Sequence, residues 1–258
     1  MTGAETWLRG VGADLRIGIL FSTRIPLPHA TALGGADVAG ASWTLPVIGA
    51  LIGLLGASVY WLAFDFNLPP LIGAALAVTA TLFITGCLHE DGLADTFDGL
   101  GGGSGRERKL EIMRDSRIGT YGACALAMSL LLRVGALASL AGPGPVTLAL
   151  IAANAGARAM VPLFLRLVPP ARPDGLSAGA GRPTQSNAAV AVLLGLVVLL
   201  GSFGVARSVV AFLLLLIVFG VMRWLCLRQI GGQTGDVAGA LEQIGEIVIL
   251  LTAVAERV

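Results

Sequence analysis

The sequence predicts an all-α protein, a polytopic transmembrane helical bundle of about seven membrane spans in one domain over residues 1–258. Hydrophobic residues make up 55% of the chain and charged residues only 13%, well below the roughly 25% charged residues usual in soluble domains. Apolar runs of about 20 residues, long enough to cross a hydrocarbon core of about 30 Å, recur along the chain. These runs lack the alternation of barrel strands, and helices satisfy their own backbone hydrogen bonds in lipid.

The first segment, at 5–28, differs from the later apolar runs because arginines such as Arg16 and Arg24 interrupt its apolar residues. Such a segment is too charged to cross a bilayer. We expect an amphipathic helix, interfacial or re-entrant, that ends near Pro26 and Pro28. The segment also lacks the basic start, apolar centre and cleavage site of a signal peptide.

The remaining apolar runs predict the spans in order. They lie at about 42–64, 71–88, 118–140, 146–167, 188–204, 208–225 and 238–255. The connections at 65–70, 141–145 and 205–207 are short, whereas those at 89–117, 168–187 and 226–237 are long and polar. The three long connections therefore share one side of the membrane.

The orientation follows from the basic residues near the span ends. Most of them lie in the N-terminal segment and the long connections, and only Arg207 and Arg257 lie on the opposite side. Basic loops stay in the cytoplasm, so we expect the polar loop at 89–117 to face the cytoplasm. No dense basic patch with interleaved aromatic residues is present, which argues against nucleic acid as a partner.

The polar loop contains the main candidate site. The stretch 89–122 carries seven of the 16 acidic residues of the chain. If the second span continues as a helix, Asp91, Asp95 and Asp98 lie on one face at i, i+4 and i+7. Their repulsion favours a divalent cation, and oxygen ligands suit Mg²⁺ or Mn²⁺. The alternative, a solvated acidic face, is disfavoured by the small and apolar residues between the aspartates.

A second acidic pair follows in the same loop. Glu111 and Asp115, at i and i+4 of a short helix, could close on the first three carboxylates. Arg114 and Arg117 flank Asp115 and could neutralise phosphate oxygens, although membrane anchoring is their alternative role.

Glycines separate the two acidic groups. Gly102 and Gly103 belong to the run GLGGGSG, whose backbone N–H groups could approach a phosphate closely, and a plain flexible linker is the alternative. Together, the carboxylates, arginines and glycines fit metal-assisted phosphoryl transfer.

Polar residues elsewhere point to the same site. Arg158, with Asn154 one turn before it, lies within the fourth span, where a charge needs a partner such as a substrate phosphate or an acidic residue. Arg133 lies similarly in the third span, and a pair with Glu246 would make it structural.

Two further residues have both a functional and a structural interpretation. Asp236 begins the seventh span among glycines, and could add a carboxylate to the metal site, line the substrate entrance or cap the helix. His89 could be a general base, a metal ligand or a hydrogen-bonding anchor at the interface.

Four strings identify a resemblance. HEDGLADTFDGLGGG at 89–103, KLEIMRDSRIGTYG at 109–122, GGQTGDVAGA at 231–240 and FSTRIPLP at 21–28 closely resemble the cobalamin synthase family of adenosylcobinamide-GDP ribazoletransferases. ARPDGLS at 171–177 is a weaker similarity. The likeness reaches both ends and the middle of the chain, and the acidic positions of the first string are intact.

The resemblance implies an enzyme of vitamin B12 assembly in the bacterial or archaeal cytoplasmic membrane. It implies that α-ribazole, or its 5′-phosphate, is joined to adenosylcobinamide-GDP with release of GMP, and that Mg²⁺ is required. The candidate metal ligands are Asp91, Asp95, Asp98, Glu111 and Asp115. The candidate catalytic residues are Asp91, Asp95, Asp98, Asp115 and His89, and the candidate substrate-binding residues are Arg114, Arg117, Arg158, Asn154, Gly102, Gly103 and Asp236. Besides the bilayer, a second copy of the chain or other nucleotide-loop enzymes are candidate partners.

Two alternative functions remain at this stage. A CDP-alcohol phosphatidyltransferase has a related acidic signature, but its Ala-Arg is missing after Gly99 and Glu111 replaces an Asp. A divalent-cation channel or transporter would carry acidic residues along the membrane interior, and here Glu242 and Glu246 lie only toward the cytoplasmic end of the seventh span.

Overall fold

The computed structural model describes residues 3–28, 34–175 and 179–255, with side chains from Gly10 onward. In this part of the chain the fold is all-helical, with one isolated bridge between Pro170 and Gln233. The helices are α1 (Gly3–Ser22), α2 (Gly35–Ala41), η1 (Ser42–Thr44), α3 (Leu45–Asp65), α4 (Pro70–Thr85), α5 (Leu88–Gly102), α6 (Arg106–Ile112), α7 (Thr120–Leu140), α8 (Pro143–Leu167), α10 (Gln185–Ile230) and α11 (Gly235–Val254). The predicted fold class, an all-α bundle, is confirmed.

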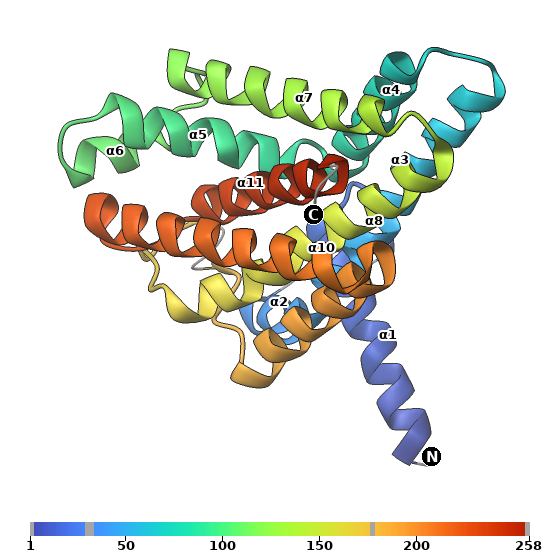
Figure 1. The fold of residues 1–258 in the computed structure, drawn as a ribbon. Coiled ribbons are helices and arrows are strands. Elements are labelled where there is room, and N and C mark those ends of the chain that lie inside the picture. The colour runs from blue at the N-terminus through green and yellow to red at the C-terminus, as the bar shows by residue number, and fades with distance from the viewer. Residues whose placement is uncertain (1–2, 29–33, 176–178, 256–258) are drawn as a thin grey trace.

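Helix α8 lies at the centre of the bundle. It packs against α3, α10 and α11, and its buried face is rich in alanine, so neighbouring backbones approach closely. Helix α5 packs against α11 on one side and α7 on the other, and these three helices run side by side in Figure 1. The polar segment that contains the candidate site is therefore part of the packed bundle.

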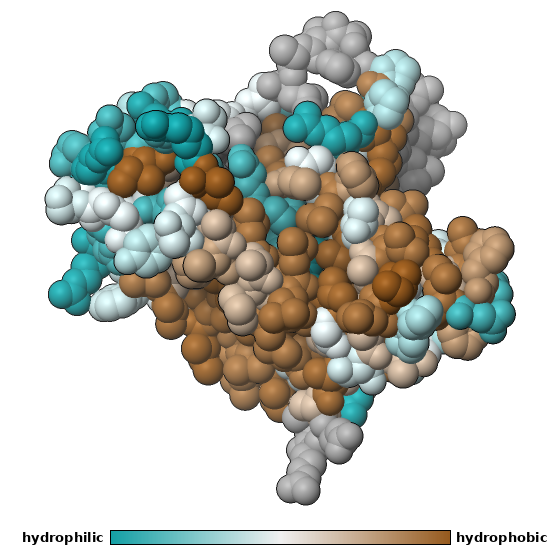
Figure 2. Space-filling view, turned by 90° about the horizontal axis from the view of Figure 1, so that it is seen from above, coloured by the Kyte–Doolittle hydropathy of each residue, from teal (hydrophilic) through white to brown (hydrophobic). Residues whose placement is uncertain are grey.

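The outer surface is largely apolar. Large hydrophobic side chains such as Trp61, Phe83, Leu131, Leu193 and Ile217 are exposed, which is expected where helices face lipid. Figure 2 shows a broad hydrophobic surface, with hydrophilic residues gathered at the end of the molecule where α6 lies. The distribution of apolar surface agrees with a membrane protein.

Among the described residues, five helical segments are long and apolar enough to cross a membrane, and a sixth is obtained if α4 and α5 count as one broken span. The predicted fifth and sixth spans are confirmed as two helices that meet at a sharp kink. They are the two parts of α10, whose 46 residues contain one non-helical residue, Gly204, with φ 71° and ψ −175°. The expected connection at 205–207 is thus helical, because a single glycine supplies the whole break.

The second predicted span also differs from the structure. Helix α4 ends at Thr85, and α5 begins at Leu88 after a bend of 89°. Gly86 and Cys87 make this turn in the left-handed region, with φ of 64° and 58°. A side chain at Gly86 would collide with Arg24, whose backbone N–H donates to Ile84 O over 2.7 Å. The expected continuous helix is wrong, but the aspartates still share one helix.

The N-terminal segment is a helix, as predicted, and α1 does not pass as a membrane span. It is joined to the bundle by Trp43, whose indole N–H donates to Asp14 over 2.8 Å. Close packing of Gly18 against Thr44 adds a second contact. From there α1 projects away from the other helices toward the N-terminus (Figure 1).

Candidate active site

Helix α5 presents its aspartates in three different environments. Asp91 is exposed, Asp95 is half-buried and Asp98 is buried. Burial, followed by the negative charges of Asp91, Asp236 and Asp98, raises the pKa of Asp95 to about 7. Burial is the largest cause, and the neighbouring acids add to it more than the positive charge of Arg172 offsets.

Asp236 reaches Asp95 because α11 lies very close to α5. A Cβ atom at Gly92 would come within 2.8 Å of Asp236 O, so only glycine permits this approach. Thr234 is the residue that caps α11, since its hydroxyl accepts the Val237 N–H and donates to Asp236 Oδ2 over 3.0 Å. Asp236 is therefore not needed as the cap, and it joins Asp91 and Asp95 in what we call the carboxylate cluster.

Asp98 has a different set of contacts. Its Oδ2 accepts the Gly119 N–H over 2.7 Å, and its Oδ1 accepts the Gly122 N–H over 2.9 Å. These are free amides of the first turn of α7, so Asp98 acts as a cap from another helix. Both oxygens are engaged with backbone, and a metal-binding role for Asp98 remains a prediction.

Arg172 lies beside the carboxylate cluster, and the sequence does not identify it as a site residue. Its Nη2 lies 3.6 Å from Asp236 Oδ2, and its charge partly offsets the raised pKa of Asp95. The signal was present in the ARPDGLS string. Apart from that string, the sequence marks Arg172 only as one of the basic residues in a long polar connection.

The loop that carries Arg172 is fixed to the end of α10. Arg106 donates to Ala171 O over 2.6 Å and to Ile230 O over 2.9 Å. The backbone of Gln233 donates to Pro169 O over 2.8 Å and accepts from Ala171 N over the same distance. Two long connections are therefore held together beside the cluster.

Glu111 and Asp115, the second acidic pair, each form an ion pair with an arginine. Arg117 Nη2 lies 2.6 Å from Asp115 Oδ2, and this hydrogen-bonded pair lowers the pKa of Asp115 to about 2. Arg108 Nη1 lies 2.7 Å from Glu111 Oε2. In this conformation the pair does not join the carboxylates of α5. Arg114, the other predicted phosphate-binding arginine, pairs with Asp174.

The glycine run is only partly a loop. Helix α5 continues through Gly102, and Gly103 is its extended C-terminal cap. Gly105, with φ of 87°, makes the turn into α6. The backbone available to a phosphate is therefore limited to Gly103–Gly105, shorter than the sequence predicts.

A buried charge network lies on the other side of α5. Arg133 Nη1 lies 2.8 Å from Glu90 Oε1, and its Nη2 lies 3.1 Å from Glu246 Oε2. Arg158 Nη1 lies 2.9 Å from Glu246 Oε1 and 2.6 Å from Glu242 Oε1, although the latter contact lacks hydrogen-bond geometry. Glu246 thus bridges both arginines, and the predicted pair of Arg133 and Glu246 is confirmed.

The predicted substrate-binding residues Arg158 and Asn154 belong to this network. Arg158 donates to Asn154 Oδ1 over 2.9 Å, and both side chains are almost fully buried. The sequence predicts a substrate phosphate or an acidic residue as the partner of Arg158, and in the structure the partner is an acidic residue, Glu246. Contact of either residue with substrate remains a prediction.

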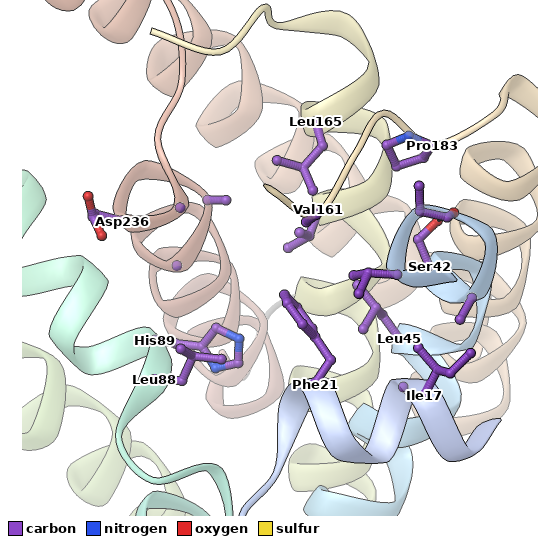
Figure 3. A pocket seen from close by; sticks show the side chains of 18 of the residues that line it. Ile17, Phe21, Ser42, Leu45, Leu88, His89, Val161, Leu165, Pro183 and Asp236 are labelled. Atoms are coloured by element: carbon purple, nitrogen blue, oxygen red, sulfur yellow. The ribbon is translucent and has the colours of Figure 1, made fainter. Parts of the chain in front are cut away.

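His89 lies where the network meets a pocket. Its Nδ1 is 3.4 Å from Arg158 Nη2 and 3.6 Å from Glu242 Oε2. The pocket is lined by His89, Asp91 and Asp236 together with apolar residues of α1, α2, α3 and α8. In Figure 3, His89 lies across the pocket from Leu45, Ser42 and Pro183, whereas the carboxylate of Asp236 points away from the pocket on the far side of α11.

The described residues contain no group of three acidic, histidine or cysteine side chains arranged to hold a metal ion. The donors nevertheless suit Mg²⁺ in kind, because carboxylate oxygens are its preferred ligands. Magnesium is commonly held by one or two carboxylates together with substrate phosphates. The carboxylate cluster fits that manner of binding, because its three carboxylates share one basic neighbour, Arg172.

Comparison with known proteins identifies the family. A family model described as cobalamin-5-phosphate synthase matches residues 14–254. An adenosylcobinamide-GDP ribazoletransferase of Bradyrhizobium diazoefficiens is 55% identical over 253 residues, which cover 98% of this chain and 97% of the relative. Enzymes of the same name from Mesorhizobium japonicum and Azorhizobium caulinodans are 50% and 47% identical, over 93% and 95% of this chain and 92% and 94% of their own lengths. No solved structure matches the chain. Because the match takes in α5, the Arg172 loop and α11, which build the carboxylate cluster, the chain belongs to the cobalamin-5-phosphate synthase family.

Proposed function

We propose that this protein is an Mg²⁺-dependent adenosylcobinamide-GDP ribazoletransferase whose active site is the carboxylate cluster. A hydroxyl oxygen of α-ribazole, or of its 5′-phosphate, forms a bond to the phosphorus nearer the cobinamide. The bond from that phosphorus to the GMP oxygen breaks, GMP departs, and the hydroxyl proton passes to a base. The products are adenosylcobalamin, or its 5′-phosphate, and GMP.

The observation that carries this proposal is the gathering of Asp91, Asp95 and Asp236 where α5 packs closely against α11, and the raised pKa of Asp95 supports it. Carboxylates held close together at an energetic cost are typical of sites that receive a cation with the substrate. One or two of the carboxylates of Asp91, Asp95 and Asp236 would hold the metal ion, together with phosphate oxygens of the substrate. When bound, the ion stabilises negative charge on the phosphoryl oxygens and the departing GMP.

Other residues of the chain position these groups. Arg172 lies beside Asp236 and is placed to meet phosphate oxygens, as arginine commonly does. Gly92 sets the distance between α5 and α11. His89 lines the pocket and is a candidate to accept the hydroxyl proton. The basic long loops favour a cytoplasmic location for the site, which both water-soluble substrates can reach.

The relatives' shared name favours this reaction over a lipid transferase or a cation transporter. The test is incubation of the purified protein in lipid nanodiscs with adenosylcobinamide-GDP, α-ribazole and Mg²⁺. We expect GMP and a cobalamin product in equal amounts, and no turnover when EDTA removes the metal. Absence of both products would refute the activity, and full turnover in EDTA would refute the metal requirement.

A further inference from the structure

The pocket beside the carboxylate cluster has two chemically different ends. One end holds Asp91, His89 and the start of α11. The other is apolar and comes from four segments of the chain, with Phe21 and Ile17 of α1, Leu45 of α3, and Val161 and Leu165 of α8 among its side chains. Figure 3 shows Phe21 projecting from α1 toward the middle of the pocket, with Val161 and Leu165 facing it from α8. Such a pocket fits a molecule with an aromatic, apolar part and a hydroxyl-bearing part.

The charge of the lining limits the ligand further. Among the described residues that line the pocket there is no lysine or arginine, and two of the lining residues are aspartates. A phosphate at the apolar end would have no cation among these residues, because Arg172 lies beside Asp236 but does not line the pocket. Burying such an uncompensated charge costs free energy. The pocket therefore suits a ligand part that is neutral.

The size of the pocket separates the two substrates. Its empty volume is about 900 Å³, part of which is open to solvent. Because that volume includes open solvent, the enclosed space is much smaller, and a corrin ring carrying a nucleotide does not fit in it. A single aromatic base at the apolar end, with its sugar in the open part, is the size of ligand that the pocket suits. The guanosine end of the donor is small enough, but it brings a charged diphosphate with it.

We propose that this pocket is the acceptor subsite, which binds the neutral benzimidazole base of α-ribazole between α1 and α8. The ribose then extends past His89 toward Asp91, which places a hydroxyl group beside the carboxylate cluster. This inference rests on the proposed function, and it adds which substrate enters which part of the molecule. It also gives α1 a role, because Ile17 and Phe21 form one wall of the subsite.

The test fills the apolar end and measures each substrate separately. Leu165→Trp places a large ring in the pocket, while Leu167→Trp, two residues along the same helix at an exposed position, is the matched control. We expect Leu165→Trp to raise KM for α-ribazole at least about tenfold and to leave KM for adenosylcobinamide-GDP unchanged. The control should leave both KM values unchanged. Val161→Phe serves as a second pocket variant if Leu165→Trp does not fold.

Binding without turnover separates this inference from the proposed reaction. Equilibrium dialysis of the wild-type protein with α-ribazole alone should show saturable binding that free dimethylbenzimidazole displaces and Leu165→Trp abolishes. If α-ribazole binds in this way but no GMP is released in the full assay, the proposed reaction fails and the subsite stands. If turnover occurs while the pocket variants leave KM for α-ribazole unchanged, or raise only KM for the donor, the subsite is refuted. Displacement by lipid but not by dimethylbenzimidazole would also refute it, since the pocket would then hold an acyl chain.

Discussion

Glu90 and Asp91 are neighbours in the sequence, yet they belong to two opposite electrostatic environments. Glu90 is buried and paired with Arg133 in a network of three glutamates and two arginines. Asp91 is exposed, lines the pocket and adds its negative charge to that of Asp95. On one side of α5 the carboxylate is paired with a buried arginine, whereas on the other side Arg172 is the basic neighbour of three carboxylates. The first arrangement stabilises the fold, and the second is suited to binding.

The sharpest test of this comparison is Asp95→Asn. We expect turnover to fall by a factor on the order of a thousand, because a ligand of the phosphoryl-transfer site is lost. The fold should survive, since Asp95 carries an uncompensated charge. GMP release and thermal unfolding in detergent measure the two effects. Asp65→Asn on the exposed end of α3 is the matched control. Near-normal turnover would remove Asp95 from the site.

In the buried network on the other side of α5, Glu246→Gln should reduce stability instead of turnover. It leaves Arg133 and Arg158 with one fewer buried carboxylate, and breaking such a pair typically costs about 3–5 kcal/mol. We expect a large loss of thermal stability, with turnover reduced only in proportion to unfolded protein. A variant that unfolds like the wild type but does not turn over would instead place Glu246 in the chemistry.

Asp98 lies between these two extremes and should show a smaller effect on stability. Asp98→Asn keeps one acceptor oxygen for the amides of Gly119 and Gly122, so we expect a loss of about 1 kcal/mol, as for other helix caps. Denaturation midpoints measure this loss. If turnover falls as far as in Asp95→Asn while stability is kept, then Asp98 is a metal ligand as the sequence predicts.

The pH dependence of metal binding tests the raised pKa of Asp95 directly. With a pKa of about 7, Asp95 is protonated below neutrality in the metal-free protein, and protons compete with the ion. We expect Mn²⁺ affinity, followed by electron paramagnetic resonance, to rise as pH increases from about 6 to about 8, by up to about tenfold per unit. The sign follows because only the ionised carboxylate binds metal. Asp95→Asn should bind weakly at every pH, and a pH-independent wild type would contradict the prediction.

The smallest effect is expected for Asp115→Asn. Asp115 is exposed and paired with Arg117, so its removal should leave thermal stability unchanged. Turnover decides whether the second acidic pair joins the site in the working enzyme. A loss comparable to that of Asp95→Asn would mean that the loop at 103–119 closes onto α5, whereas a modest loss agrees with the separation seen in this structure.

The sequence was informative where the periodicity of one helix decided the outcome. The spacing of Asp91, Asp95 and Asp98 predicted a common helix correctly, and the charge within the third span correctly suggested that Arg133 pairs with Glu246. The surroundings of these residues depend on packing between distant segments. Asp98 meets the amides of α7, and Arg172 meets Asp236, because of contacts that no local pattern specifies. The bend at Gly86 was missed because a glycine within an apolar run is also common in straight membrane helices.

The bend between α4 and α5 has a practical consequence for handling the protein. Arg24 packs against Gly86 and its backbone N–H holds Ile84, while Phe21, three residues earlier, forms a wall of the pocket. Residues 17–24 are therefore part of the functional unit, although they precede the membrane spans. Versions of the protein that are shortened from the N-terminus should keep this segment, and affinity tags are better added before α1 than substituted for it.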